Sequence, residues 1–190
     1  MRKIILQTKE IYLRKINIDD IDNGWLEWVN DKSLCKYLLN SNGYSRDELI
    51  DYMQNSKLPD SLLFAVCRVK DDKYIGNIRL SIDKANLRAA YGILIGASNH
   101  GCKNAGTNAL ILIAYYGFYI LNLNKIYSGI VLDNIASIKS CVKAGFQVEG
   151  IFKEFTQIDG IFYDDLRVSM LRSDFEKKGL ASLIIKSDNG

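Results

Sequence analysis

A continuous run of apolar residues, 109–121, constrains the fold of this chain more than any other feature of its sequence. The run has thirteen residues, too few for a membrane-spanning helix, which needs about 20. A helix that is apolar on nearly every side is stable only when other elements cover it. We therefore expect a buried helix over residues 108–121, packed between a sheet and a further layer of a soluble protein.

Seven segments with alternating or β-rich patterns predict the strands of that sheet. They are residues 11–14, 62–69, 74–83, 89–97, 126–132, 146–155 and 161–171. The last two flank the turn signal Asp159-Gly160, so they are expected to pair as a hairpin.

A short helix is predicted near the N-terminus of the chain. Asp19 and Asp20 suit the start of a helix, and Trp25 and Trp28 lie three residues apart on its apolar stripe. Both indole rings are expected to pack in the core, and one of them is expected to reach a substrate if this helix lines a cleft.

Two more helices carry clear end signals. Ser45 and Glu48 form a capping-box pattern at the start of one, and Gly145 ends the other, over residues 135–144. The order of all elements predicts the α/β class, with a mixed, partly parallel sheet of six to seven strands flanked by about four helices.

Length and charge narrow the classes of protein further. The 190 residues predict one domain over 1–190, with its core at about 11–175. The net charge of +3 is small and the basic residues are scattered, which excludes a nucleic-acid-binding protein. The first residues lack the apolar stretch of a signal peptide, so neither secretion nor a membrane is expected.

Cysteine and histidine exclude two kinds of site. The four cysteines are Cys35, Cys67, Cys102 and Cys141, more than thirty residues apart, and His100 is the single histidine. A Cys/His zinc cage cannot be built from them, so no metal is expected, and a Ser-His-Asp site would have to use His100. Reduced thiols in a cytoplasmic protein are the simplest interpretation.

Residues 93–107 are the segment that most clearly indicates a ligand-binding site. A strand ends in a loop of small residues that opens into a helix, which presents unpaired N–H groups and the positive end of the helix dipole to a phosphate. Gly101, Ala105 and Gly106 would admit a ligand close to the backbone, and Lys103 adds a charge. The spacing is neither a Walker loop nor a dinucleotide fingerprint. A plain strand-to-helix connection is the alternative.

Four segments in this order resemble the GNAT superfamily of acyl-CoA-dependent N-acyltransferases. They are residues 74–78 (YIGNI), 91–95 (YGILI), 101–107 (GCKNAGT) and 134–146 (NIASIKSCVKAGF). The resemblance covers roughly residues 11–175. It implies a single GNAT-like acyltransferase domain that moves an acetyl group from acetyl-CoA directly to a primary amine.

The resemblance also implies roles for individual residues. Cofactor-binding residues are expected at Leu94, Ile95, Ala97, Gly101, Cys102, Lys103, Asn104, Ala105, Gly106, Thr107, Asn134 and Ser137. The catalytic candidates are Asn134 and Cys141, and the substrate candidates are Trp28 and Tyr91. Asn134 is alternatively an N-cap, and Cys141 alternatively a small buried residue. Ser137 and Ser140 are further donors near the sulfur.

The chain departs from the family pattern in three places. Gly101 replaces the Arg or Gln that opens the loop, and Asn104 replaces the first glycine, although asparagine tolerates a left-handed backbone. Cys141 stands where many relatives have a tyrosine that protonates the leaving thiolate. Ala90 stands where some have a catalytic glutamate.

The sequence identifies neither the amine acceptor nor the general base. The base is undecided among Asp83, Glu149, Glu154, Asp164 and Asp165. The segment LNLNKI at 121–126 and the modest charge favour a nucleotide-linked amino sugar as the small-molecule acceptor. A protein N-terminus, as in ribosomal-protein acetyltransferases, another small amine and a non-catalytic CoA-binding module are the alternatives. The apolar strands at 146–155 and 161–171 suit a homodimer.

Overall fold

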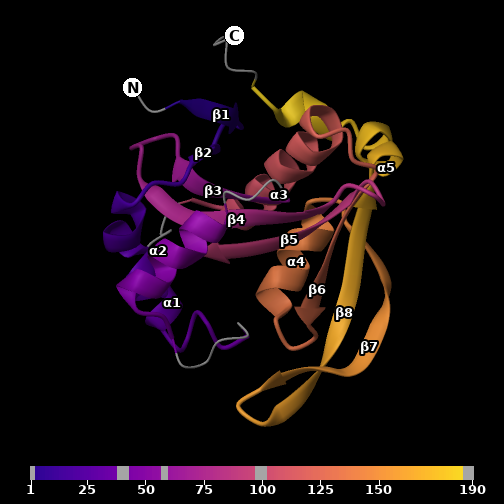
Figure 1. The fold of residues 1–190 in the computed structure, drawn as a ribbon. Helices are drawn as coiled ribbons and strands as arrows, with labels where there is room; N and C mark the ends of the chain where they lie inside the picture. The colour runs from indigo at the N-terminus through magenta and orange to yellow at the C-terminus, as the bar shows by residue number, and fades with distance from the viewer. Residues whose placement is uncertain (1–2, 38–42, 57–59, 97–101, 186–190) are drawn as a thin grey trace.

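The computed structural model describes residues 3–37, 43–56, 60–96 and 102–185, and its centre is a single sheet (Figure 1). The eight strands are β1 (Ile4–Gln7), β2 (Ile11–Lys15), β3 (Ser61–Arg68), β4 (Tyr74–Asp83), β5 (Arg88–Ile95), β6 (Lys125–Val131), β7 (Gln147–Ile158) and β8 (Ile161–Leu171). They are ordered β1-β2-β3-β4-β5-β6-β8-β7. All neighbours are antiparallel except β5 and β6, which run parallel. The sheet is therefore mixed and partly parallel, as predicted.

Helices cover both faces of this sheet. In the described ranges they are α1 (Leu26–Asn30), α2 (Arg46–Asn55), α3 (Ala105–Tyr115), α4 (Ile135–Lys143) and α5 (Arg172–Lys177). A kinked segment, Ile21–Trp25, leads into α1, and a π-helical turn, Tyr116–Ile120, prolongs α3. Within the described residues, no helix combines the length and the apolar character that a membrane span requires.

The structure confirms the predicted end signals of α2, of α4 and of the β7–β8 hairpin. The Ser45 hydroxyl accepts a hydrogen bond from the Glu48 amide, and the Glu48 carboxylate accepts one from the Ser45 amide, which completes the capping box of α2. Gly145 ends α4 with φ of 99°. Asp159 and Gly160 turn the β7–β8 hairpin with φ of 50° and 80°.

The strand and helix counts differ from the prediction. The sheet has eight strands rather than six to seven, because β1 adds a four-residue edge strand to β2. The helices number five in the described residues rather than about four, because the six-residue α5 follows β8. Elements this short give too few periods of apolar spacing to stand out in a sequence. Helix α3 begins at Ala105, earlier than the predicted 108, since Asn104 sets its first turn.

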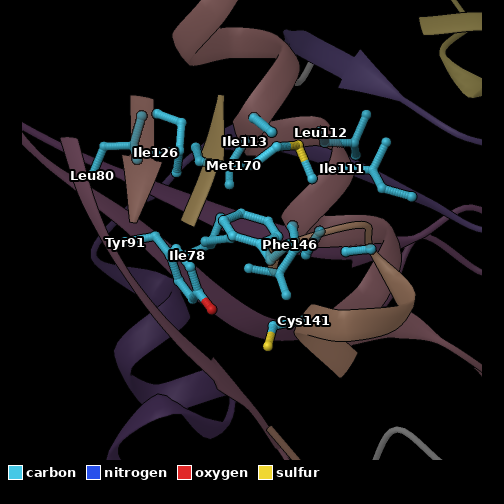
Figure 2. Packing of buried hydrophobic residues seen from close by; sticks show 14 of the residues in the cluster. Ile78, Leu80, Tyr91, Ile111, Leu112, Ile113, Ile126, Cys141, Phe146 and Met170 are labelled. Carbon is cyan, nitrogen blue, oxygen red and sulfur yellow. The ribbon is translucent and has the colours of Figure 1, made fainter. Parts of the chain in front are cut away.

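The apolar helix is buried as predicted. Its side chains meet those of β4, β5, β6 and β8 in one core (Figure 2), and Phe118 also contacts the ring of Phe175 on α5. A second core fills the opposite face under α1 and α2. Strand β3 serves both, with Phe64 facing α3 and Leu63 facing α1 and α2. The sheet therefore lies between two helical layers.

A buried ion pair fixes the helical segment 21–30 to the sheet. Arg14 on β2 donates to both oxygens of Asp20, Nη1 to Oδ2 at 2.7 Å and Nη2 to Oδ1 at 2.6 Å. Both side chains are almost completely buried, at 3% and 2% exposure. Asp20 Oδ2 also accepts from the Asn17 amide. The chain that carries α1 is thus anchored at the point where it leaves β2.

We predict that Asp20→Asn lowers the free energy of unfolding by about 3 kcal/mol or more, because it leaves the Arg14 guanidinium buried without its counter-charge. The matched control is Asp22→Asn, two residues later, which removes an exposed pair with Arg46 and should change stability little. Urea unfolding of the three proteins measures both. Equal midpoints for the two variants would contradict the anchoring role.

Candidate active site

The parallel junction between β5 and β6 opens into a gap. Strand β5 pairs with β4 along its whole length, from Arg88 to Ile95, but it pairs with β6 only from Arg88 to Ala90. Beyond that point one side-chain bond joins the two strands, from Ser128 Oγ to the Tyr91 carbonyl at 3.0 Å. The second half of β5 therefore has an edge that β6 does not cover.

The direction of the backbone shows what this edge offers. The Gly96 amide donates to the Ile75 carbonyl on the β4 side at 2.9 Å. Since successive amides of a strand point to opposite sides, the N–H groups of Ile95 and Ile93 point toward the gap. The donors expected at 94–97 are therefore represented by Ile95, whereas the Leu94 amide faces β4 and Ala97 lies outside the described residues.

A cavity of about 810 Å³ lies along this gap. Residues of α1, α2, β4, β5, β6, β7 and β8, together with the start of α4, line it. Its charged lining residues in the described ranges are Arg79, Asp165 and Arg167. Of the five carboxylates considered as the base, only Asp165 lines the cavity.

Three of the other four carboxylates have partners outside the cavity, and the fourth, Glu154, does not line it. Glu149 binds Lys125 and Ser169, which lower its pKa. Asp164 binds Lys153 and the amide of Glu154. Asp83 binds Asn86 and Arg88 in the turn before β5. These contacts are typical of structural roles in turns and strand pairs.

The start of α3 leaves its first amides uncapped. Asn104 adopts the left-handed conformation predicted for it, with φ of 63° and ψ of 24°, but its side chain caps no amide. Asn104 Oδ1 instead accepts from Lys143 Nζ at 2.7 Å. The lysine charge therefore lies beside the positive end of the α3 dipole, where an anion is stabilised. Ala105, Gly106 and Thr107 begin this helix, as expected for a phosphate site.

Other parts of the expected cofactor site are placed around α3. Cys102 is buried and Lys103 exposed just before the helix, while Gly101 and His100 lie outside the described residues. Thr107 Oγ1 donates to the Ser140 carbonyl at 3.3 Å, which joins α3 to α4. Helix α4 therefore follows α3 closely along the rim of the gap.

Asn134 acts as the N-cap that was its alternative role. Its Oδ1 accepts from the Ser137 amide at 3.1 Å, and both residues line the cavity. The cap uses the side-chain oxygen, and the Nδ2 group has no bond to another described residue. The cap thus leaves an amide donor beside the cavity for a ligand.

Cys141 and Tyr91 meet behind the cavity wall. Cys141 is fully buried and donates to the Ile138 carbonyl, and burial raises the pKa of its thiol. The Tyr91 ring packs edge-on to Phe146, and its hydroxyl points toward Cys141 (Figure 2). Burial raises the pKa of Tyr91 well above its usual range, so the hydroxyl stays protonated. Tyr91 lines the cavity and Cys141 does not.

The two tryptophans take different positions. Trp28 is buried against the ring of Tyr74, with centroids 5.0 Å apart, and does not line the cavity. Trp25 lines it instead, next to Tyr52. The kink at Gly24, where φ is 133°, rotates the helical segment so that the earlier ring faces the cavity. The expectation that one indole lines the cleft is met by Trp25 rather than Trp28.

Sequence reasoning missed two cavity arginines. Arg79 interrupts the apolar strand β4, where it donates to the Tyr52 hydroxyl at 3.0 Å and to Ser61. Arg167 stands between the buried Leu166 and Val168 on β8. A cation flanked by apolar residues in a strand was the available signal, because such a charge needs a buried partner or a ligand.

Comparison with known proteins agrees with this geometry. A model of the acetyltransferase (GNAT) domain matches residues 10–147. The chain is 26% identical to the probable N-acetyltransferase YjcK of Bacillus subtilis (strain 168), over 91% of this chain and 100% of that protein. It superposes with a TM-score of 0.79 on spermidine N-acetyltransferase from Vibrio cholerae in complex with CoA and spermine, at 24% identity, covering 87% of this chain and 98% of that one.

A further solved structure has the same fold with a nucleotide bound. It is the microcin C7 self immunity acetyltransferase MccE in complex with acetyl-CoA and AMP. The TM-score is 0.74 at 19% identity, and the match covers 85% of this chain and 92% of that one. At this identity the likeness shows the fold alone.

We predict that Asn104→Val weakens CoA binding about tenfold, because a β-branched residue strains the left-handed position that starts α3, at a cost of about 1–3 kcal/mol. Asn122→Val is the matched control. Asn122 also has a positive φ, 54°, and its Oδ1 accepts from Arg172, but it follows the C-terminal end of this helical segment rather than its start. Calorimetric titration with CoA should show a weaker Kd for the first variant only. Equal losses would contradict a role of this turn in cofactor binding.

Proposed function

The chain belongs to the acetyltransferase (GNAT) family and is an N-acetyltransferase with acetyl-CoA as its co-substrate, and we propose that its acceptor is the primary amine of a nucleotide-linked amino sugar. The observation that carries the proposal is the cavity along the β5–β6 gap, whose charged lining combines two guanidinium groups with one carboxylate, Asp165. This arrangement suits an acceptor that has both an amine and a negative charge.

The proposed transfer uses the gap as its frame. The amides of Ala105, Gly106 and Thr107 bind the pyrophosphate, with Lys143 beside them. The Ile95 N–H polarises the thioester carbonyl, a contribution of about 10²–10³ in rate for one such donor. The amine nitrogen forms the new bond to the carbonyl carbon, and the carbon–sulfur bond breaks. The departing sulfur needs a donor, and a protonated hydroxyl is available at Tyr91.

In this scheme the Tyr91 hydroxyl has the role that a tyrosine on the helix corresponding to α4 has in many relatives. Its hydroxyl comes from β5 and lies against Cys141, the α4 residue where many relatives have that tyrosine. The small cysteine leaves room for the ring. We therefore propose Tyr91 as the donor to the sulfur and Cys141 as its packing partner, with Asn134 Nδ2 donating to the pantetheine arm.

The charges in the cavity favour an anionic acceptor over a polyamine. Two arginines and one carboxylate line it in the described residues. A polycation such as spermidine would meet repulsion from the arginines, whereas the diphosphate of a nucleotide sugar would pair with them. A protein N-terminus, as a single cation without a phosphate, fits less well.

We predict that acetyl-CoA releases free CoA thiol faster with a nucleotide-linked 4-amino sugar than with spermidine or an N-terminal peptide. Arg79→Met should raise the KM for that sugar about tenfold, because it removes a charged hydrogen bond, and should leave the KM for acetyl-CoA unchanged. Arg88→Met is the control, since Arg88 is also a strand arginine near a tyrosine ring, Tyr127, but lies outside this cavity.

Two results would contradict this assignment. A preference for spermidine over the sugar would show that the acceptor is a polyamine. Tight CoA binding without thiol release for any amine would favour the non-catalytic CoA-binding module instead.

The edge of the sheet supports a homodimer. Strand β7 is the last in the order, so one side of it has no neighbouring strand among the described residues. The β7–β8 hairpin extends away from the helical layers (Figure 1). Its exposed apolar residues are Val148, Ile151, Phe152, Phe155, Ile161 and Phe162. An exposed apolar edge strand is a template for a second copy of the same strand. We propose that two copies pair here.

We predict that Ile151→Lys converts a dimer into a monomer in light scattering at micromolar concentration, because it places a charge on the pairing edge. Leu183→Lys is the control, since Leu183 is equally exposed, at 49% against 48%, near the C-terminal end of the described chain. A monomeric wild-type protein, or a dimer that survives the first substitution, would contradict pairing through β7.

A further inference from the structure

We propose that Asp165 and Arg167 form a two-charge acceptor site, in which Asp165 binds the reacting amine and receives its proton while Arg167 binds an anionic group of the same molecule. The inference rests on the proposed acetyl transfer and assigns residues to its acceptor side. The ligand class is a primary amine that has a phosphate or carboxylate near the nitrogen.

Unpaired polar atoms are concentrated at this point of the cavity. The buried side-chain atoms without a hydrogen-bond partner in the described residues are Arg14 Nε, Tyr91 Oη, Asp165 Oδ1, Arg167 Nε and Arg167 Nη2. Three of these five atoms belong to Asp165 and Arg167, which line the cavity, whereas Tyr91 Oη lies against Cys141 on the α3 side of the sheet. A buried polar group without a partner destabilises the folded protein, so such groups are expected where a ligand supplies the missing bond.

The two charges form an ion pair without a hydrogen bond between them. Arg167 Nη2 lies 3.5 Å from Asp165 Oδ2, longer than a charged hydrogen bond of about 2.7–2.9 Å. The Arg14–Asp20 pair, with two bonds at 2.6 and 2.7 Å, shows how a closed pair looks in the same molecule. The open pair keeps one carboxylate oxygen and two guanidinium nitrogens for a third group.

The surroundings hold the pair in this open geometry. The guanidinium carbon of Arg167 lies 4.4 Å from the centre of the Phe152 ring and 4.1 Å from that of Phe155, so the side chain is held by both rings. Gly129 on β6 makes the space for it. A Cβ there would lie 2.7 Å from Arg167 Nη1 and 2.8 Å from Asp165 Oδ2. The position admits no larger residue without moving the pair.

The chemistry follows from this placement. A neutral amine donates a hydrogen bond to Asp165 Oδ1, which orients the nitrogen lone pair for attack. As the nitrogen–carbon bond forms, the nitrogen gains positive charge, and its proton passes to Asp165 Oδ1. The carbon–sulfur bond then breaks and the electron pair leaves with the sulfur. Arg167 binds the anionic group throughout and so selects amines that have one.

Two side-chain substitutions in the full-length protein test these roles. Asp165→Asn should lower kcat at least 100-fold, the usual range for loss of a general base, with the KM for acetyl-CoA unchanged. Arg167→Lys should raise the KM for an amino-sugar phosphate about tenfold or more and remove its advantage over the same amino sugar without phosphate. Thermal unfolding checks that both variants fold.

A pair of glycines tests the geometry without removing a charge. Gly129→Ala displaces the pair and should reduce kcat/KM for the amino-sugar phosphate at least tenfold. Gly150→Ala on β7 is the matched control, because a Cβ there meets no atom within 4 Å, and it should keep wild-type kinetics. Loss of activity in Gly129→Ala alone supports the site.

The outcomes separate this inference from the proposed function. If the wild-type protein acetylates amines and Asp165→Asn retains its kcat within threefold, or Arg167→Lys retains the preference for the phosphate, the two-charge site is wrong and the transfer activity stands. If the wild-type protein binds CoA and releases no thiol with any amine, the transfer activity is wrong and this site with it.

Discussion

The three-residue limit on the pairing of β5 with β6 is the constraint on which the rest of the site depends. Parallel strands that stayed paired along their length would satisfy their amides with each other and would leave no room for a ligand. Here the pairing stops at Ala90, and the Ile93 and Ile95 amides point into the gap. The cavity and its polar lining lie along that opening, and α4, which accepts a hydrogen bond from Thr107 at the start of α3, contributes Asn134 and Ser137 to the lining.

The opening is tolerated because both faces of the sheet are secured elsewhere. The core around α3 holds β4, β5, β6 and β8 from one side, and α1 and α2 cover β3 and β4 from the other. Arg14 and Asp20 join the second layer to β2 at the far side of the sheet. Strands β5 and β6 can therefore separate locally while their side chains stay packed. This packing offsets the energetic cost of the strand hydrogen bonds that the gap leaves unformed.

The sequence predicts most of the helices and strands but fewer of the residues that line the site. Long periodic segments and end signals, such as the Ser45 capping box and Gly145, fixed the main helices and strands, because local chemistry decides them. The tolerance of asparagine for a left-handed backbone likewise allowed for the turn observed at Asn104. The short β1 and α5 were missed because they depend on tertiary pairing. Trp28 was placed in the cavity instead of Trp25 because the kink at Gly24 changes which ring faces it.

The acceptor side was the least predictable part. Asp165 was one of five carboxylates with no local signal to separate them. It lies beside Arg167 because residues two apart on strand β8 share a face, and the register of β8 against β6 brings that face to the cavity. Arg79 and Arg167 had a signal, a cation within an apolar strand, but the partner of such a charge depends on the fold. The meeting of Tyr91 with Cys141 joins residues fifty positions apart and follows from packing alone.

The hairpin β7–β8 connects to the remainder of the sheet through one strand, since β8 pairs with β6 and β7 pairs with β8 alone in the described chain. It contributes Asp165, Arg167 and both phenyl rings, whereas the amides of α3 and β5 come from a separate part of the chain. Under the proposed acetyl transfer, substitutions in the hairpin would change which amine is bound while the coenzyme side is left intact. The same fold would then bind different amines through changes in the β7–β8 hairpin alone.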